Sequence, residues 1–134
     1  MEIARVLLDT SAYPAFSRGH AGLKEALQEA EEIFINVVVL GELLSGFRIG
    51  SHRKKNEKEL RVFLASPRVN LLQMDDQTAD RYALILTFLW EQGTSIPTND
   101  LWIAASAAQH GLRLLTTDRH YERVPHIAVD YFEP

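Results

Sequence analysis

The chain has 134 residues, 14 basic and 18 acidic side chains, and a formal net charge of −4. Its 46% hydrophobic and 24% charged residues are typical of a folded globular protein and exclude a disordered chain. The lack of cysteine excludes disulfides, thiolate metal sites and a cysteine nucleophile, and the acidic balance counts mildly against a nucleic-acid-binding protein.

The length suits one domain, 1–134, and no linker or repeat divides it. In the first half of the chain, hydrophobic spacing predicts a strand at 3–8, a helix at 23–31, a strand at 33–36, an apolar helix at 38–48 and a charged helix opened by Ser51. In the second half it predicts a strand at 69–73, a long helix that is capped by Asp75 or Asp76 and runs to Trp90, and a helix at 100–110. Two last strands are predicted at 112–116 and 127–132. This alternation predicts an α/β fold with a central, mostly parallel sheet flanked by helices. No apolar run reaches the length of a membrane span and nothing resembles a targeting signal, so a cytoplasmic protein is expected.

Four acidic side chains stand out against this pattern. Asp9 and Asp118 follow predicted strands, at the edge where parallel sheets bind ligands. Glu42 lies in the helix at 38–48, which is apolar on nearly every face and is predicted to be buried, so an unpaired carboxylate there is costly. Asp100 opens a largely apolar helix. If the four converge, their oxygens suit a hard divalent cation, and their mutual repulsion raises their pKa values unless a cation compensates.

Each acid also has an ordinary explanation. Asp9 and Asp118 suit a strand end or a turn, Asp100 suits the positive end of a helix dipole, and Glu42 suits a surface position. Spacing alone therefore makes a shared site plausible and leaves these alternatives open.

Four motifs occur in order along essentially the whole chain: LLDTS at 7–11, LGELLSGF at 40–47, IPTNDLWIAA at 96–105 and LTTDRHY at 115–121. Together they resemble the PIN-domain nucleases, and specifically the VapC-type toxins of toxin–antitoxin pairs. The resemblance implies a single PIN-like domain with helices on both faces of the sheet. It also implies an RNA substrate, a cognate antitoxin protein, a homodimer and no membrane association.

The same resemblance implies that Asp9, Glu42, Asp100 and Asp118 hold Mg²⁺ or Mn²⁺, and that a metal-activated water hydrolyses an RNA phosphodiester bond. Asp9 and Asp100 are expected to bind the metal directly. Whether Glu42 and Asp118 bind the ion or act through water stays open.

Three further residues bear on the support of that site. Thr116 matches a hydroxyl position that family members use to support it. Asn36 lies where many relatives carry a small hydroxyl residue, and Val39 replaces a frequent threonine. These two departures affect the polar support of the site and not its four acids.

Basic side chains concentrate in the middle of the chain, at Arg48, His52, Arg53, Lys54, Lys55, Lys58, Arg61 and Arg68. Such a run is either a solvated helix face or a guide for RNA phosphates. If it guides RNA, Arg48, Arg53, Lys54, Lys55 and Lys58 are the expected residues.

Two other groups have open interpretations. An apolar stripe, Leu84, Ile85, Phe88 and Leu89, is most simply core, but with Trp90 and Trp102 it also suits a dimer or antitoxin surface. The five histidines lack metal-ligand spacing and are interpreted as surface or turn residues, with His120 alone near the expected site.

Two other functions remain open at this point. Phosphatases of the haloacid-dehalogenase type also begin with a strand ending in aspartate, but they need a second aspartate where this chain has Ser11. A catalytically silent PIN-like module that only binds a partner would keep the same acids.

Overall fold

Five parallel strands form one sheet in the computed structural model, which describes residues 4–134. The strands are β1 (Arg5–Leu8), β2 (Glu32–Asn36), β3 (Val69–Leu72), β4 (Arg113–Thr116) and β5 (Val129–Tyr131), in the spatial order β3-β2-β1-β4-β5. The predicted α/β fold with a parallel sheet is confirmed. The first strand begins at Arg5, and residue 3 of the prediction lies outside the described residues.

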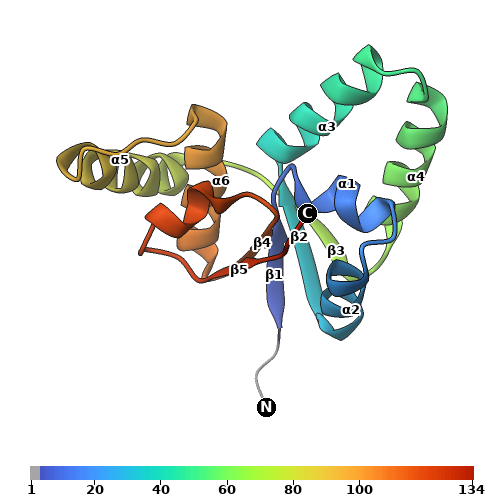
Figure 1. Cartoon of the computed structure of the whole chain (residues 1–134), viewed down its shortest axis with the longest axis horizontal. Coiled ribbons are helices and arrows are strands. Elements are labelled where there is room, and N and C mark those ends of the chain that lie inside the picture. The colour runs from blue at the N-terminus through green and yellow to red at the C-terminus, as the bar shows by residue number, and fades with distance from the viewer. Residues whose placement is uncertain (1–3) are drawn as a thin grey trace.

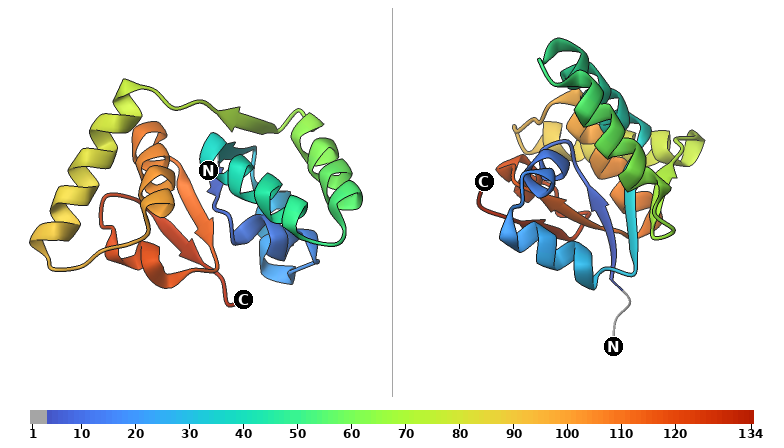
Figure 2. Two further views of the ribbon diagram at one scale, coloured as in Figure 1. Left: turned by 90° about the horizontal axis from the view of Figure 1, so that it is seen from above. Right: turned by 90° about the vertical axis from the view of Figure 1, so that its right-hand side faces the viewer.

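Helices cover both faces of this sheet, as Figures 1 and 2 show. They are α1 (Ala12–Ser17), α2 (Ala21–Glu29), α3 (Val37–Ile49), α4 (Arg53–Ala65), α5 (Asp76–Glu91) and α6 (Thr98–His110), with a short 3-10 helix, η1 (Arg119–Arg123). The chain steps from β1 to β2 to β3 in one direction and then crosses back to β4 on the other side of β1. Because such crossovers are right-handed, α1 to α4 lie on one face and α5 and α6 on the other.

The reversal of strand order places a switch point between β1 and β4, where ligands bind in open α/β sheets. The two strands pair in register, with Leu7 opposite Leu114 and Leu8 opposite Leu115. These four leucines are at most 1% exposed and form the centre of the core. The polar residues that follow both strands are therefore held on a rigid frame.

Helix α3 differs from its prediction. Only Val39 and Leu43 are buried on it, whereas Gly41 and Ser45 are exposed and Glu42 is partly exposed. The helix packs along one face against β2, α4 and α6, and with α4 it forms an arm that extends beyond the sheet (Figure 1). The expectation of a buried helix is wrong because its apolar residues are shared between the core and this partly covered arm.

Other boundaries also shift. Helix α4 begins at Arg53, after His52, so Ser51 does not open it. Helix α6 begins at Thr98, which puts Asp100 in its first turn. The pattern does not predict α1, which has only six residues and contains Pro14, or η1, which is too short to show a period. Among residues 4–134, no helix combines the length and apolar character needed to cross a bilayer.

Candidate active site

Asp9 follows β1 directly and is 3% exposed. Its carboxylate accepts hydrogen bonds from the Thr116 hydroxyl at 2.6 Å, the Ser11 hydroxyl at 2.8 Å and the Ala12 backbone N–H at 2.8 Å. Burial raises the pKa of Asp9 from 3.8 to about 6, although these hydrogen bonds act to lower it. Repulsion from Asp100 adds the smallest contribution, so the raised pKa comes mainly from lost solvation.

Thr116, at the end of β4, is fully buried and ties the two central strands together at this point. Its hydroxyl donates to Asp9 and accepts from the Asp118 backbone N–H at 2.9 Å. Ser11 also accepts from the Thr117 N–H at 3.0 Å. One hydroxyl from each side of the switch point therefore fixes the orientation of the Asp9 carboxylate.

Glu42 reaches this edge from α3. One of its oxygens accepts a hydrogen bond from the Thr10 hydroxyl, and the other accepts from the Asn99 amide at 3.2 Å. Thr10 follows β1 and Asn99 lies in the first turn of α6, so Glu42 joins three elements. Asn36 sets the direction of α3, because its side chain accepts from the Val39 N–H at 2.9 Å and its amide donates to Ser106 on α6 at 3.0 Å.

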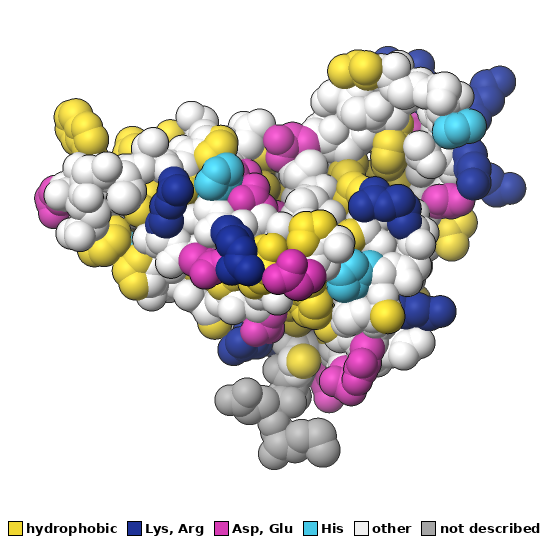
Figure 3. Space-filling view, in the orientation of Figure 1, with side chains coloured by type: hydrophobic (Ala, Val, Ile, Leu, Met, Phe, Trp, Pro, Cys, Tyr) yellow, Lys and Arg dark blue, Asp and Glu magenta, His cyan; other side chains and the backbone are white. Residues whose placement is uncertain are grey.

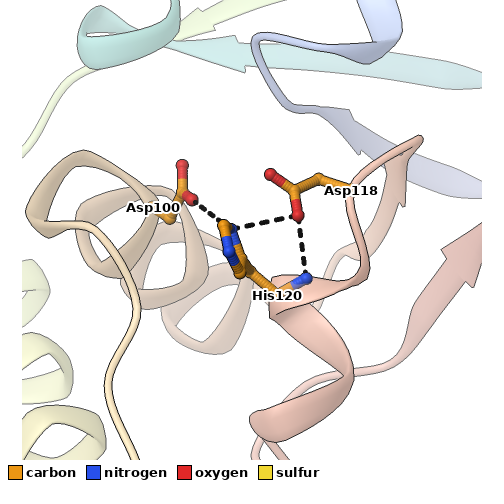
Figure 4. A group of neighbouring side chains, drawn as sticks. All are labelled: Asp100, Asp118 and His120. Carbon is orange, nitrogen blue, oxygen red and sulfur yellow. Dashed lines mark hydrogen bonds and ion pairs between the residues drawn. The ribbon is translucent and has the colours of Figure 1, made fainter.

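Asp100 and Asp118 approach each other around His120 (Figure 4). His120 Nδ1 lies 3.0 Å from Asp118 Oδ1 and 3.5 Å from Asp100 Oδ2. The His120 backbone N–H also donates to Asp118 Oδ1 at 2.8 Å. One ligand atom from each of the three residues lies within 4.8 Å of the others, which makes them a group able to hold a metal ion. Burial raises the pKa of Asp100, and the nearby charges of Asp118 and Glu42 raise it further.

Tyr121 lies beneath these acids and is completely buried. Burial raises the pKa of its phenol, and the negative charges of Asp9, Asp100 and Asp118 raise it further. The hydroxyl contacts the Asp100 carboxylate, yet it has no hydrogen bond of regular geometry among residues 4–134. The buried hydroxyl therefore faces the acids with only this loose contact to Asp100, which leaves room in the polar site for a further ligand.

The structure thus brings the predicted acids to one edge of the sheet. Electrostatic interactions connect Asp9 to Asp100, and Asp100 to Asp118 and Glu42. His120, Tyr121 and Ser11 also belong to this edge but are not among the predicted site residues. The sequence carried one signal for them, since all three lie within two or three residues of a predicted acid.

The remaining predicted groups lie elsewhere. The basic residues Arg48, Arg53, Lys54, Lys55 and Lys58 are exposed on the arm, and Figure 3 shows Lys and Arg side chains along its outer side. Arg53 pairs with Glu57 at 3.2 Å. Arg68 instead donates to the carbonyl groups of Leu27 and Ala30 at the end of α2, which gives it a structural role.

The apolar stripe on α5 divides into two parts. Ile85 and Leu89 are buried in the core, whereas Leu84 is 53% and Trp90 is 81% exposed. Trp102 stacks on Tyr82 with ring centroids 4.1 Å apart, so it joins α6 to α5. Asp75 caps α5 as predicted, accepting from the Gln77 and Thr78 N–H groups.

A parallel α/β sheet with carboxylates gathered at its switch point defines a protein with an acidic ligand site of the kind that suits divalent cations. The family model described as PIN domain matches residues 6–127, and the chain belongs to this family. Within it the chain is of the VapC type. It is 29% identical over 134 residues to Ribonuclease VapC4 of Mycobacterium tuberculosis, covering 96% of this chain and 98% of that one.

Another relative and a solved structure are consistent with the VapC type. The chain is 33% identical over 112 residues to Ribonuclease VapC5 of Mycobacterium tuberculosis, with 84% of this chain and 82% of that one covered. It also superposes with a TM-score of 0.78, at 29% identity, on the crystal structure of VapBC-5 from Mycobacterium tuberculosis, a member of the VapBC family of toxin–antitoxin systems. That match covers 96% of this chain and 99% of the other.

Proposed function

We propose that this protein is the toxin of a toxin–antitoxin pair and a divalent-metal-dependent endoribonuclease. It acts in the cytoplasm as one PIN domain spanning 1–134. The relatives named as VapC ribonucleases support the activity. The observation that carries the proposal is Asp9, a buried carboxylate that is fixed by three hydrogen bonds at the switch point. It interacts with Asp100, which in turn interacts with Asp118 and Glu42.

The donor set fits a divalent cation. Asp9 and Asp100 are proposed as direct ligands of Mg²⁺, or of Mn²⁺, and their raised pKa values are what a cation would reverse. The Tyr121 hydroxyl, buried without a regular hydrogen bond, marks the polar space beside them. When bound, the cation lowers the pKa of water and neutralises charge on the phosphate.

The side chains divide the remaining work. Thr116 and Ser11 hold the Asp9 carboxylate in one orientation, so that it needs little reorganisation to bind an ion. Glu42 is held between Thr10 and Asn99, and its proposed role is to orient the attacking water or to bind the ion. The Asp118 carboxylate accepts from the His120 backbone N–H, and the Asp118 backbone N–H donates to the Thr116 hydroxyl. Asp118 is proposed to act on the ion directly or through water.

Basic residues on the arm are proposed to guide RNA. Arg48, Arg53, Lys54, Lys55 and Lys58 are exposed, and Figure 3 shows acidic side chains in the hollow between this arm and the side formed by α5 and α6. Positive charge on the arm attracts the phosphate backbone to this side of the molecule, and a cation at the acidic site would allow its close approach.

A cognate antitoxin is proposed to neutralise the enzyme by covering the acidic groove. The structural relative VapBC-5, from a toxin–antitoxin family, supports this partner. A homodimer is proposed as well. Leu84 and Trp90 on α5 are apolar and exposed, which suits an interface with a second copy or with the antitoxin.

The experiment that tests the proposal is cleavage of a panel of RNAs by the wild type and by Asp9→Asn, with Mg²⁺, with Mn²⁺ and with EDTA. We expect metal-dependent cleavage by the wild type and a loss of at least about 100-fold in the variant, since Asp9 is the most firmly held acid of the site. Asp80→Asn, which changes an exposed aspartate on α5, is the matched control.

The cleavage experiment also bears on the catalytically silent module, and the family match bears on the haloacid-dehalogenase alternative. Absence of cleavage by the wild type on every RNA would favour the catalytically silent binding module. The haloacid-dehalogenase alternative is already at odds with membership of the PIN family, and the position where it needs a second aspartate holds Ser11, which hydrogen-bonds to Asp9.

A further inference from the structure

His120 occupies an unusual position for a histidine interpreted as a turn residue. Its side chain is 41% exposed, but its Nδ1 atom is buried between the carboxylates of Asp100 and Asp118. Although Nδ1 lies within ion-pair distance of both, it makes no hydrogen bond of regular geometry among residues 4–134 (Figure 4). The ring nitrogen Nδ1 therefore points into the acidic cluster but forms no regular hydrogen bond with its carboxylates.

The spacing of the three atoms matches that of metal ligands. Adjacent ligands of an octahedral ion with bonds of about 2.1 Å lie about 3 Å apart. His120 Nδ1 lies 3.0 Å from Asp118 Oδ1 and 3.5 Å from Asp100 Oδ2, and all three atoms lie within 4.8 Å of one another. An ion would thus need only small side-chain rotations to contact all three.

Tyr121 supplies an independent indication of a ligand at the same place. It is the next residue along η1, is completely buried, and its hydroxyl lies among Asp9, Asp100 and Asp118 without a regular hydrogen bond to any described residue. Its contact with the Asp100 carboxylate falls short of regular hydrogen-bond geometry, so the hydroxyl keeps capacity for an ion-bound water in the cluster.

We propose that His120 is a direct metal ligand of this site through Nδ1, beside Asp100 and Asp118, and that this nitrogen makes the site prefer Mn²⁺ over Mg²⁺. The inference rests on the proposed metal-dependent function, which by itself requires only carboxylates. Imidazole nitrogen is a favourable ligand for transition-metal ions, whereas Mg²⁺ binds through oxygen and keeps much of its water.

The fold holds His120 ready for this role. Its backbone N–H donates to Asp118, which fixes the start of η1, so that the imidazole projects back over the two acids. Replacing the side chain leaves this backbone hydrogen bond in place. A His120→Ala variant should therefore keep the loop geometry and lose only the nitrogen.

The test is pulsed electron paramagnetic resonance of Mn²⁺ bound to the wild-type protein, which detects nitrogen coordinated to the metal. We expect a nitrogen coupling that changes when histidine alone is labelled with ¹⁵N and that disappears in His120→Ala. His52→Ala is the matched control, because His52 is exposed and makes no capping hydrogen bond. Titration calorimetry should show a loss of at least about 10-fold in Mn²⁺ affinity in His120→Ala, with a smaller change for Mg²⁺.

Bound Mn²⁺ without nitrogen coupling in the wild type, or with the same coupling in His120→Ala, would overturn the inference while leaving metal-dependent cleavage intact. Absence of Mn²⁺ and Mg²⁺ binding altogether would overturn both this inference and the proposed function.

Discussion

Asp9 carries an energetic cost in the metal-free protein that follows from its burial. Its pKa is about 6 in the folded state, against 3.8 for an exposed aspartate. The folded protein therefore binds the proton more tightly than the unfolded chain does. As the pH rises from about 4 to above 6, ionisation of Asp9 lowers the free energy of unfolding, by about 3 kcal/mol in total.

The cost of burying the charged Asp9 predicts that Asp9→Asn changes the stability of the metal-free protein. At pH 7.5 and without metal, the variant should unfold at higher urea concentration than the wild type, with a gain of about 1–3 kcal/mol, because the amide carries no charge to bury. The difference should shrink toward pH 4, where the wild-type carboxyl is protonated. A variant that is less stable than wild type at pH 7.5, with Asp80→Asn unchanged, would contradict this explanation.

Most of the candidate site could be predicted from the sequence, including the supporting hydroxyl of Thr116, whereas His120 and Tyr121 could not. Asp9, Glu42, Asp100 and Asp118 stand out because each interrupts an apolar segment or ends a strand. His120 and Tyr121 do not, since a histidine and a tyrosine in a polar turn have many ordinary explanations. The short helix η1 directs both side chains toward the acids. A helix of five residues is too short to be predicted from hydrophobic periodicity.

The orientation of helix α3 depends on Asn36, the residue that joins it to strand β2. Asn36 caps the helix and also donates to Ser106 on α6, so one buried side chain orients the helix that carries Glu42. This residue replaces the small hydroxyl residue that the resemblance leads one to expect, and it supplies both the cap and the link to α6. Val39, beside it, is fully buried and gives the site no polar support.

Substitution of Asn36 should separate its two roles. Asn36→Ser keeps a cap and loses the link to Ser106, so a loss of about 1 kcal/mol in the free energy of unfolding is expected. Asn36→Ala loses both and should cost about 2–3 kcal/mol. Urea unfolding measures both values. Equal losses in the two variants would show that the cap contributes nothing.

The arm formed by α3 and α4 is the element whose shape was least predictable. Its residues have helical spacing, but the pattern cannot tell a buried helix from one that packs on a single side and extends outward. The strands were easier to predict, because short apolar runs between polar turns match a sheet buried on both faces. The proposed role of its basic residues in guiding RNA requires this exposure of the arm.

Charge reversal on α4 tests that role. Lys54→Glu, Lys55→Glu and Lys58→Glu together should weaken RNA binding by at least about 10-fold and reduce the slope of log affinity against log salt by about 2. Lys54 and Lys55 lie in the first turn of α4, where glutamate is favoured by the helix dipole, so the fold should be kept. Lys24→Glu, at an exposed position on α2, is the control, and binding that stays at the wild-type level in the triple variant would exclude RNA guidance.

At the scale of the whole molecule, the net charge matches the charge of the proposed site. Without Asp9, Glu42, Asp100 and Asp118 the chain has 14 acidic and 14 basic residues, so its net charge of −4 equals the charge of the proposed site. The acidic balance therefore counts against a nucleic-acid ligand only if every carboxylate is treated as surface. With the four acids gathered at the switch point and basic side chains on the arm, a divalent cation would offset part of the negative charge that repels RNA at the proposed site.

The central claim, that a cation held by this acidic cluster is required for RNA cleavage, is tested most directly by measuring Mn²⁺ occupancy and RNA cleavage rate on the same samples over a range of Mn²⁺ concentrations. We predict that the rate rises in proportion to the occupied site in the wild type and stays near zero in Asp9→Asn at every concentration. Cleavage by the wild type in metal-free buffer, or cleavage by Asp9→Asn at the wild-type rate, would contradict it.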